Sequence, residues 1–169
     1  MHYIDQGGVI MYILLALNII GFTTMIIKLI QFLWARSKKR AIIEKVYDEL
    51  KVHDKEAQLV LGKDMLTEKM VKCERGLSTI RIIASIAPLF GLLGTVIGVL
   101  SAFEAISKQG LGDPSIFAGG ISLALITTVG GLIVAIPHYI GYNYLIGMLD
   151  KLEANLNTEM SVKIYESAS

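Results

Sequence analysis

Two threonines are the polar side chains best placed for chemistry, because each interrupts a long apolar run of the sequence. Thr95 lies in the charge-free run 82–103, and Thr128 lies in the charge-free run 114–149. A hydroxyl group both donates and accepts hydrogen bonds, so these two side chains could hold water or a titrating carboxyl group inside a membrane. Alternatively, each hydroxyl only bonds back to a carbonyl group of its own helix.

The depth of the two threonines along their helices favours a shared role. Thr95 follows Arg81 by about 21 Å of helix, and Thr128 follows Asp113 by about 22 Å from the opposite side. If these charged residues mark the edges of a membrane about 40–45 Å thick, both hydroxyls lie near its middle. If the charges lie nearer the hydrocarbon boundary, the two threonines part by about two helical turns.

Each threonine also belongs to a stripe of small residues that recurs every three or four positions and so follows one helix face. The first stripe consists of Ala84, Pro88, Gly91, Thr95, Gly98 and Ala102. The second consists of Ala124, Thr128, Gly131, Ala135, His138 and Tyr142. One interpretation is close helix packing in lipid. The other is that both faces line a cavity shared with further chains, with the threonines as its polar points.

The remaining chemistry-bearing residues exclude several function classes. No ionisable residue falls in the middle of an apolar run, so a proton relay needs a carboxylate from another polypeptide. The formal net charge of +1 argues against a nucleic-acid binder. Cys73 has no second thiol for a disulfide or a zinc site. Neither a His-Glu-x-x-His motif nor a phosphate-cradling loop occurs, and we expect no enzyme, no metal and no cofactor.

The elements that must position the threonines are membrane helices. Apolar residues make up 53% of the chain and charged residues 18%, against about a quarter charged in soluble domains. Three runs of 22, 22 and 36 residues carry no charge, and about 20 apolar residues cross the hydrocarbon core. We therefore predict an all-α membrane protein with transmembrane helices over 9–34, 81–103 and 115–149. The third helix either projects beyond the membrane or breaks near Pro137.

Basic residues predict the orientation of the chain in the membrane. They crowd the segment 35–80, are absent from the tail 1–8, and number only one, Lys108, in the turn 104–114. We expect the tail 1–8 and the turn to lie outside, and the loop 35–80 and the tail 150–169 to lie inside. The first apolar segment has no basic start and no cleavage-like end, so we interpret it as a retained anchor.

The inner loop carries two patterns that predict amphipathic helices continuing the membrane helices into the cytoplasm. The first pattern is Ile42, Ile43, Val46 and Leu50. The second steps through Leu66, Met70, Cys73, Leu77, Ile80 and Ala84, and runs without a break into the second apolar block. Gly62 and Lys63 interrupt the periodicity between the two patterns and predict a turn there.

Two segments resemble signatures of the MotA/TolQ/ExbB proton-channel family. Residues 87–98, APLFGLLGTVIG, resemble its second-helix signature, and residues between Gly120 and Asn143 resemble its third-helix signature, including the pair Thr127-Thr128. Three crossings with an outside N-terminus are similar to ExbB and TolQ, whereas MotA-type subunits have a fourth crossing. The resemblance covers most of the chain.

The resemblance implies a homo-oligomeric ring, a pentamer in the family, around a dimer of an ExbD- or TolR-like protein. The single membrane helix of that partner carries an essential Asp, and proton passage past it drives a movement passed to a TonB- or TolA-like protein. The implied location is the bacterial inner membrane, with a periplasmic N-terminus and a cytoplasmic C-terminus. Many relatives have Glu where this chain has Leu123, which leaves the partner's Asp as the carrier.

The resulting hypothesis is an ExbB-like inner-membrane proton-channel subunit that serves TonB-dependent outer-membrane transport. Thr95 and Thr128 would line the proton pathway. Packing and clearance around the central helix would come from Pro88, Gly91, Gly98, Ala124, Gly131, Ala135 and Pro137. The alternatives are a TolQ-like subunit of the Tol envelope-maintenance system and a non-conducting membrane scaffold.

Overall fold

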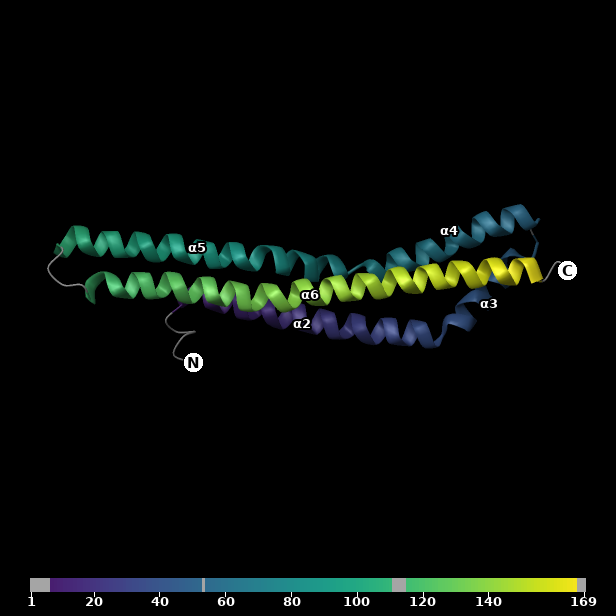
Figure 1. The fold of residues 1–169 in the computed structure, drawn as a ribbon, viewed down its shortest axis with the longest axis horizontal. Helices are drawn as coiled ribbons and strands as arrows, with labels where there is room; N and C mark the ends of the chain where they lie inside the picture. The colour runs from purple at the N-terminus through teal and green to yellow at the C-terminus, as the bar shows by residue number, and fades with distance from the viewer. Residues whose placement is uncertain (1–6, 53, 111–114, 167–169) are drawn as a thin grey trace. The chain divides into compact units, whose positions relative to one another are not determined.

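The computed structural model describes residues 7–52, 54–110 and 115–166, and nearly all of these residues are helical (Figure 1). The helices are α2 (Gly8–Ser37), α3 (Lys39–Leu50), α4 (Lys55–Glu74), α5 (Leu77–Gln109) and α6 (Ser115–Glu166). Three of them, α2, α5 and α6, are long and apolar enough to cross a membrane. The prediction of an all-α membrane protein is therefore confirmed. Parts of the predicted tail 1–8, turn 104–114 and tail 150–169 lie outside the described residues.

The chain divides into two compact units, each built from segments distant in the sequence. The first unit comprises residues 1–25 and 79–141, and the second comprises residues 26–78 and 142–169. The first unit holds both threonine-bearing segments. The second unit holds α3, α4 and most of the charged residues.

Helix α6 is a single helix of 52 residues. The sequence predicted either a helix that projects beyond the membrane or a break near Pro137. The helix continues through Pro137, so the first alternative is the one observed. Its charge-free part is followed by an apolar stripe with buried Leu149, Leu152 and Leu156, which gives the helix a partner surface beyond the apolar block. At about 1.5 Å per residue, a helix of this length exceeds the roughly 30 Å of the hydrocarbon core.

The second unit packs the stripe of α6 against α3 and α4. Its core contains three groups of buried residues: Ile43, Val46 and Leu50 of α3, Leu66 and Met70 of α4, and Leu149, Leu152, Leu156, Met160 and Ile164 of α6. Polar contacts join the same helices at their edges. Lys39 forms an ion pair with Glu159, and the Thr67 hydroxyl donates to Glu153 over 3.0 Å. Of the predicted amphipathic face, Ile43, Val46 and Leu50 are buried, whereas Ile42 is half-buried.

Two predictions about the segment 51–84 were wrong. Gly62 and Lys63 do not form a turn but lie inside α4. A Cβ atom at Gly62 would lie 3.1 Å from Cε of Met160 and 3.2 Å from Cδ1 of Leu50, so the glycine allows close packing rather than a chain reversal. The second stripe also does not continue as one helix, because α4 ends at Glu74 and α5 begins at Leu77.

Gly76 makes the break between α4 and α5. Its φ of 98° lies in the left-handed region, which glycine adopts without the steric cost of a Cβ atom. Lys28 of α2 completes this helix end, because its ammonium group donates to the carbonyl oxygen of Cys73 over 3.1 Å. The last carbonyl groups of a helix lack partners within the helix, and a cation there is favourable. Lys28 is only 9% exposed.

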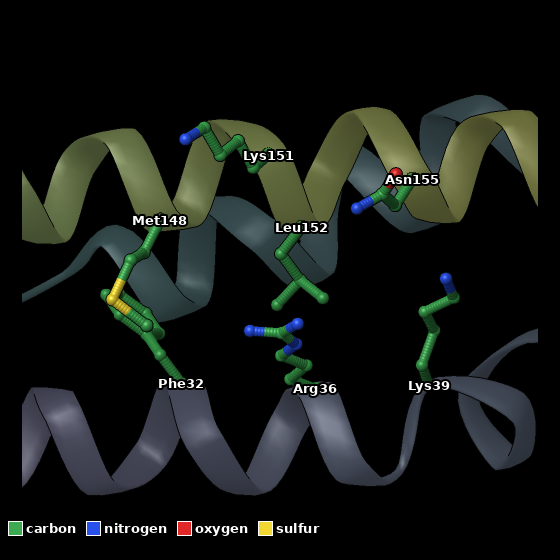
Figure 2. Close-up of a pocket in the computed structure, with 7 residues that line it drawn as sticks. All are labelled: Phe32, Arg36, Lys39, Met148, Lys151, Leu152 and Asn155. Atoms are coloured by element: carbon green, nitrogen blue, oxygen red, sulfur yellow. The ribbon is translucent and has the colours of Figure 1, made fainter.

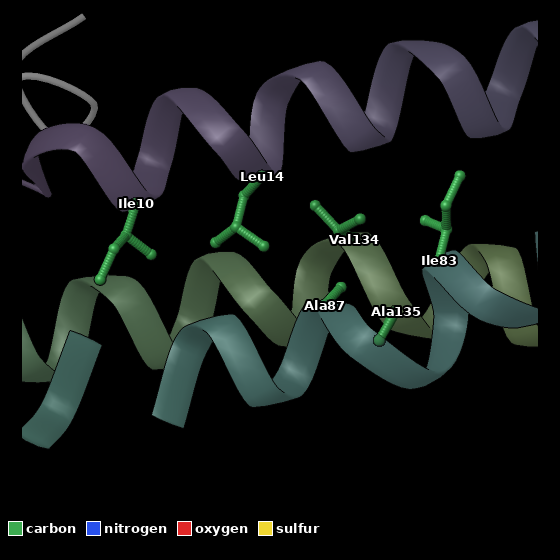
Figure 3. Close-up of a cluster of buried hydrophobic side chains, with 6 residues drawn as sticks. All are labelled: Ile10, Leu14, Ile83, Ala87, Val134 and Ala135. Carbon is green, nitrogen blue, oxygen red and sulfur yellow. The ribbon is translucent and has the colours of Figure 1, made fainter. Parts of the chain in front are cut away.

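The first unit packs α2 against α5 and α6 through a small apolar cluster (Figure 3). Its buried members are Ile10 and Leu14 of α2, Ile83 and Ala87 of α5, and Val134 and Ala135 of α6. The cluster fixes α5 and α6 next to each other, and the contact that carries the threonines begins beside it.

Candidate functional site

Glycines bring the backbones of α5 and α6 into direct contact. A Cβ atom added at Gly91 would lie 2.9 Å from the carbonyl oxygen of Thr127 and 3.1 Å from Cα of Thr128. One added at Gly98 would overlap the carbonyl oxygen of Gly120 and lie 2.9 Å from the amide nitrogen of Ala124. Side chains larger than hydrogen at these positions would hold the helices apart. The small residues are therefore used for close packing within the chain.

The contact pairs give the register of the two helices. Gly91 lies against Thr128 and Gly131, whereas Gly98, two turns later in α5, lies against Gly120 and Ala124. Since later residues of α5 meet earlier residues of α6, the helices are antiparallel. In this register Thr95 lies about one helical turn from the level of Thr128, which is closer than the two turns that the sequence left open.

Thr95 and Thr128 both lie at an edge of this contact, and at the same edge. Thr95 follows Gly94 of the contact by one residue, and Thr128 follows Thr127 by one residue. One residue is a rotation of about 100° around a helix. In an antiparallel pair, the same rotation along each chain leads to the same side of the interface. Both side chains are half-buried, so they face outward from the α5–α6 pair on one side.

The hydroxyl protons of both threonines are used within their own helices. Oγ1 of Thr95 donates to the carbonyl oxygen of Leu92 over 2.6 Å, and Oγ1 of Thr128 donates to that of Ala124 over 3.1 Å. A hydroxyl oxygen keeps its lone pairs when it donates. Each threonine can therefore accept a hydrogen bond from water or from a protonated carboxyl group at this edge.

An apolar groove on α5 continues from Thr95. Its other lining residues are Val96, Val99, Leu100 and Phe103. Phe103 is 65% exposed, and the other three are exposed as well. Thr95 is thus the polar end of an otherwise apolar surface that the described part of the chain leaves uncovered.

The remaining predicted site residues are divided among different contacts. Gly91, Gly98 and Ala124 lie between α5 and α6, as does Gly131, whose Cβ atom would lie 2.7 Å from the carbonyl oxygen of Ala87. Ala135 belongs to the apolar cluster with α2. Pro88 and Pro137 lie inside α5 and α6 respectively, and both are half-buried.

Thr127 is a contact residue that the sequence reasoning did not select. Its side chain is fully buried, and its hydroxyl donates to the carbonyl oxygens of Leu123 and Ala124 over 2.9 and 3.0 Å. A Cβ atom at Gly94 would overlap this hydroxyl group. The available signal was the spacing of Ala124, Thr127 and Gly131, which fits a helix face as well as the spacing through Thr128 does.

His138 was predicted to share the stripe of Thr128, but its side chain packs against a different helix, α2. The side chain is fully buried against α2, where a Cβ atom at Gly21 would overlap the imidazole ring. Its Nδ1 atom lies 2.6 Å from the carbonyl oxygen of Val134, so Nδ1 is the donor, and Nε2 has no hydrogen-bond partner among the residues that the structure describes. The ring of Phe22 packs edge-on at 4.8 Å.

Among the described residues, no three His, Cys, Asp or Glu side chains lie close enough together to hold a metal ion. The α5–α6 edge accordingly offers hydroxyl groups and carbonyl groups in apolar surroundings. Such a set can hydrogen-bond a proton carrier but holds no carboxylate of its own.

Comparisons with known proteins agree with this description. The sequence model of the MotA/TolQ/ExbB proton channel family matches residues 35–158. The chain is 35% identical over 92 residues to the biopolymer transport protein exbB1 of Vibrio cholerae, covering 54% of this chain and 40% of the relative. It is 48% identical over 67 residues to ExbB of Aquifex aeolicus, covering 40% and 45%.

A third relative is an ExbB homolog of Methanothermobacter thermautotrophicus, which is 45% identical over 82 residues, covering 48% of this chain and 29% of the relative. The matched segments thus span less than half the length of these relatives. The three apolar helices and the match to a proton channel family together support a membrane protein. The matched family is one of channels and not a class of enzymes.

Proposed function

Because the chain belongs to the MotA/TolQ/ExbB proton channel family, we propose that it is an ExbB-like subunit of an inner-membrane proton channel. With an ExbD-like partner it converts the proton motive force into work for TonB-dependent outer-membrane transport. The names of its relatives, biopolymer transport proteins, support this assignment. The subunits form a ring, a pentamer as in the family, with a periplasmic N-terminus and a cytoplasmic C-terminus.

The observation that carries the proposal is the shared edge of α5 and α6. Thr95 and Thr128 lie on one side of the contact, with oxygen lone pairs free to accept. The partner's carboxyl group donates its proton to such an oxygen or to a bound water when it is neutral. When it is ionised, the same groups can turn and donate to it. The threonines therefore stabilise the carrier in both protonation states.

The proton carrier itself comes from the partner chain. Leu123 stands where the family resemblance implies Glu, and its side chain is half-buried and apolar. Its carbonyl oxygen accepts from the Thr127 hydroxyl, so the position contributes only to packing and to the helix. A single-crossing partner with an Asp in its membrane helix supplies the missing carboxylate.

The glycines act on the pathway through distance. Gly91, Gly98 and Gly131 hold α5 and α6 in backbone contact, and this contact determines how far apart the two threonines are. These glycines were also predicted to leave space for the partner's central helix. We include that role in the proposal, because helices that pack closely through glycine leave more room beside their contact. Pro88 and Pro137 are proposed to shape the helices around it.

Proton flux into liposomes tests the proposal. The chain is reconstituted with its ExbD-like partner, and Thr95→Val and Thr128→Val are compared with wild type. A hydrogen bond to a charged group contributes about 1.5–3 kcal/mol, so each valine should lower the flux about tenfold or more while the complex still assembles. Thr79→Val on α5 and Thr158→Val on α6 are matched controls at exposed positions, and both should conduct normally.

The same assay separates the alternatives. Wild-type flux that is unchanged by either valine would remove the threonines from the pathway but leave a channel. If the partner is bound and the flux does not exceed that of empty liposomes, the result would support the non-conducting scaffold. The close glycine contact is compatible with a scaffold as well. A partner of the TolR type in place of the ExbD type would assign the chain to the Tol system.

A further inference from the structure

The second unit contains a pocket between α2 and α6 that the channel proposal does not use (Figure 2). Its apolar lining consists of Phe32, Met148 and Leu152. Its polar lining consists of Arg36, Lys39, Lys151 and Asn155. Figure 2 shows the Phe32 and Met148 side chains meeting between the helices, with Arg36 directed toward Leu152. The pocket therefore mixes apolar and cationic side chains, with Leu152 opposite Arg36 and the Lys151 side chain extending along α6 toward Met148 (Figure 2).

Both helices change from apolar to charged sequence at this pocket. In α2 the apolar run ends just before Arg36, and in α6 it ends at Leu149, two residues before Lys151. The exposed apolar residues that precede the pocket on α2 include Ile30 and Leu33, at 61% and 51%. The pocket thus lies where the surface of the second unit passes from lipid-compatible to water-compatible.

The cations of the pocket are only partly neutralised by the chain itself. Lys39 is paired with Glu159. Arg36 and Lys151 form no ion pair with any residue that the structure describes. No acidic side chain lines the pocket. Glu153, the nearest acidic residue after Lys151 in α6, accepts a hydrogen bond from Thr67 on α4.

We propose that this pocket binds the headgroup of an anionic phospholipid from the membrane leaflet that faces it. The guanidinium group of Arg36 binds the phosphate through two parallel hydrogen bonds, and Lys151 contributes a second positive charge. Phe32, Met148 and Leu152 contact the glycerol region and the first acyl carbons. A soluble phosphate would leave these three apolar side chains without a partner, which is why the lipid is the occupant that fits.

The lipid would join two parts of the second unit, the end of α2 and α6. Arg36 stands at the end of α2, directly before α3, whereas Lys151 belongs to α6. One phosphate bound by both cations therefore fastens the end of α2 to α6, as the Lys39–Glu159 ion pair does for α3. The proposal needs only that the chain lies in a membrane, and it does not depend on proton conduction.

Native mass spectrometry of the full chain in detergent tests this site. The protein is loaded with phosphatidylglycerol or phosphatidylcholine, and retained lipid is measured for wild type and for the double variant Arg36→Gln/Lys151→Gln. Each basic side chain near an anionic lipid is worth about a fivefold change in affinity. The double variant should therefore retain phosphatidylglycerol about thirtyfold less well, whereas phosphatidylcholine should bind weakly to both proteins.

Lys38→Gln is the matched control, because Lys38 is exposed, neighbours the site in sequence, and lies over the Trp34 ring at 3.9 Å instead of in the pocket. It should retain phosphatidylglycerol as wild type does. Equal retention by the double variant and by Lys38→Gln would overturn the proposal. Displacement of the lipid by glycerol 3-phosphate at equal concentration would also overturn it, since that result indicates a soluble phosphate. Circular dichroism confirms that each variant is folded.

Discussion

The backbone contact between α5 and α6 can be tested with two adjacent glycines of α6. A Cβ atom at Gly120 would lie 2.9 Å from both Cβ and N of Ala102 and would overlap the Gly98 carbonyl oxygen. A Cβ atom at Gly119 would have no neighbour within 4 Å. Ordinary carbon contacts begin at about 3.5 Å, so Gly120→Ala must part the helices by about 0.6 Å or more. Gly119→Ala requires no movement.

The two variants isolate the packing contribution because the helix-propensity gain is common to both. Replacing glycine by alanine inside a helix is favourable by about 0.8–1.0 kcal/mol. Overpacking a tight contact costs about 1–3 kcal/mol. Gly120→Ala should therefore be less stable than Gly119→Ala by about 1–3 kcal/mol, although it can lie close to wild type.

Titration with sodium dodecyl sulfate in mixed micelles, followed by far-ultraviolet circular dichroism, gives this difference. Gly98→Ala provides a second measurement from the opposite helix. The pair Gly98→Ala/Gly120→Ala should cost less than the two single variants together, because the first alanine has already moved the helices apart. Equal stability of Gly119→Ala and Gly120→Ala would refute the close contact.

Two further contacts give predictions of the same kind. Gly21→Ala should destabilise the chain by about 1–3 kcal/mol in the same titration, because its Cβ atom overlaps the His138 ring, and His138→Ala should relieve most of that cost; additive effects would contradict this contact. Lys28→Met removes the hydrogen bond to the Cys73 carbonyl oxygen, so the last turn of α4 should open more often and its amide hydrogens should exchange about tenfold faster. Lys72→Met, at an exposed i,i+4 ion pair of α4, should leave that rate nearly unchanged.

The three long helices were predictable because charge-free runs reveal membrane helices without any knowledge of tertiary contacts. The breaks between helices were harder to predict. The stripe through Met70, Leu77 and Ile80 is buried as its periodicity indicates, yet the left-handed backbone of Gly76 breaks the helix within it. A helical pattern records which residues are buried, and a single residue with positive φ can interrupt the helix without disturbing that pattern.

The threonines show how far periodicity determines a site. The stripe predicted from the sequence passes through Thr128, while the contact with Gly94 uses Thr127. These two choices differ by one residue, and small-residue spacing of three and four accommodates both. Only the contact with the neighbouring helix determines which of the two threonines faces it. His138 illustrates the same limit, because the glycine that accepts its ring lies on α2, more than a hundred residues earlier in the chain.

The two interpretations of the small-residue stripes are compatible, because close packing and the proposed cavity can use different residues of each stripe. The glycines lie inside the α5–α6 contact, so they do not face a partner chain. The threonines lie at the edge of that contact and stay accessible. The cavity that we propose therefore lies beside the contact, on the threonine side. It follows that Gly98→Ala should change both stability and proton flux, whereas Thr95→Val should change flux alone. A threonine variant that lost stability as much as flux would place Thr95 in the packing.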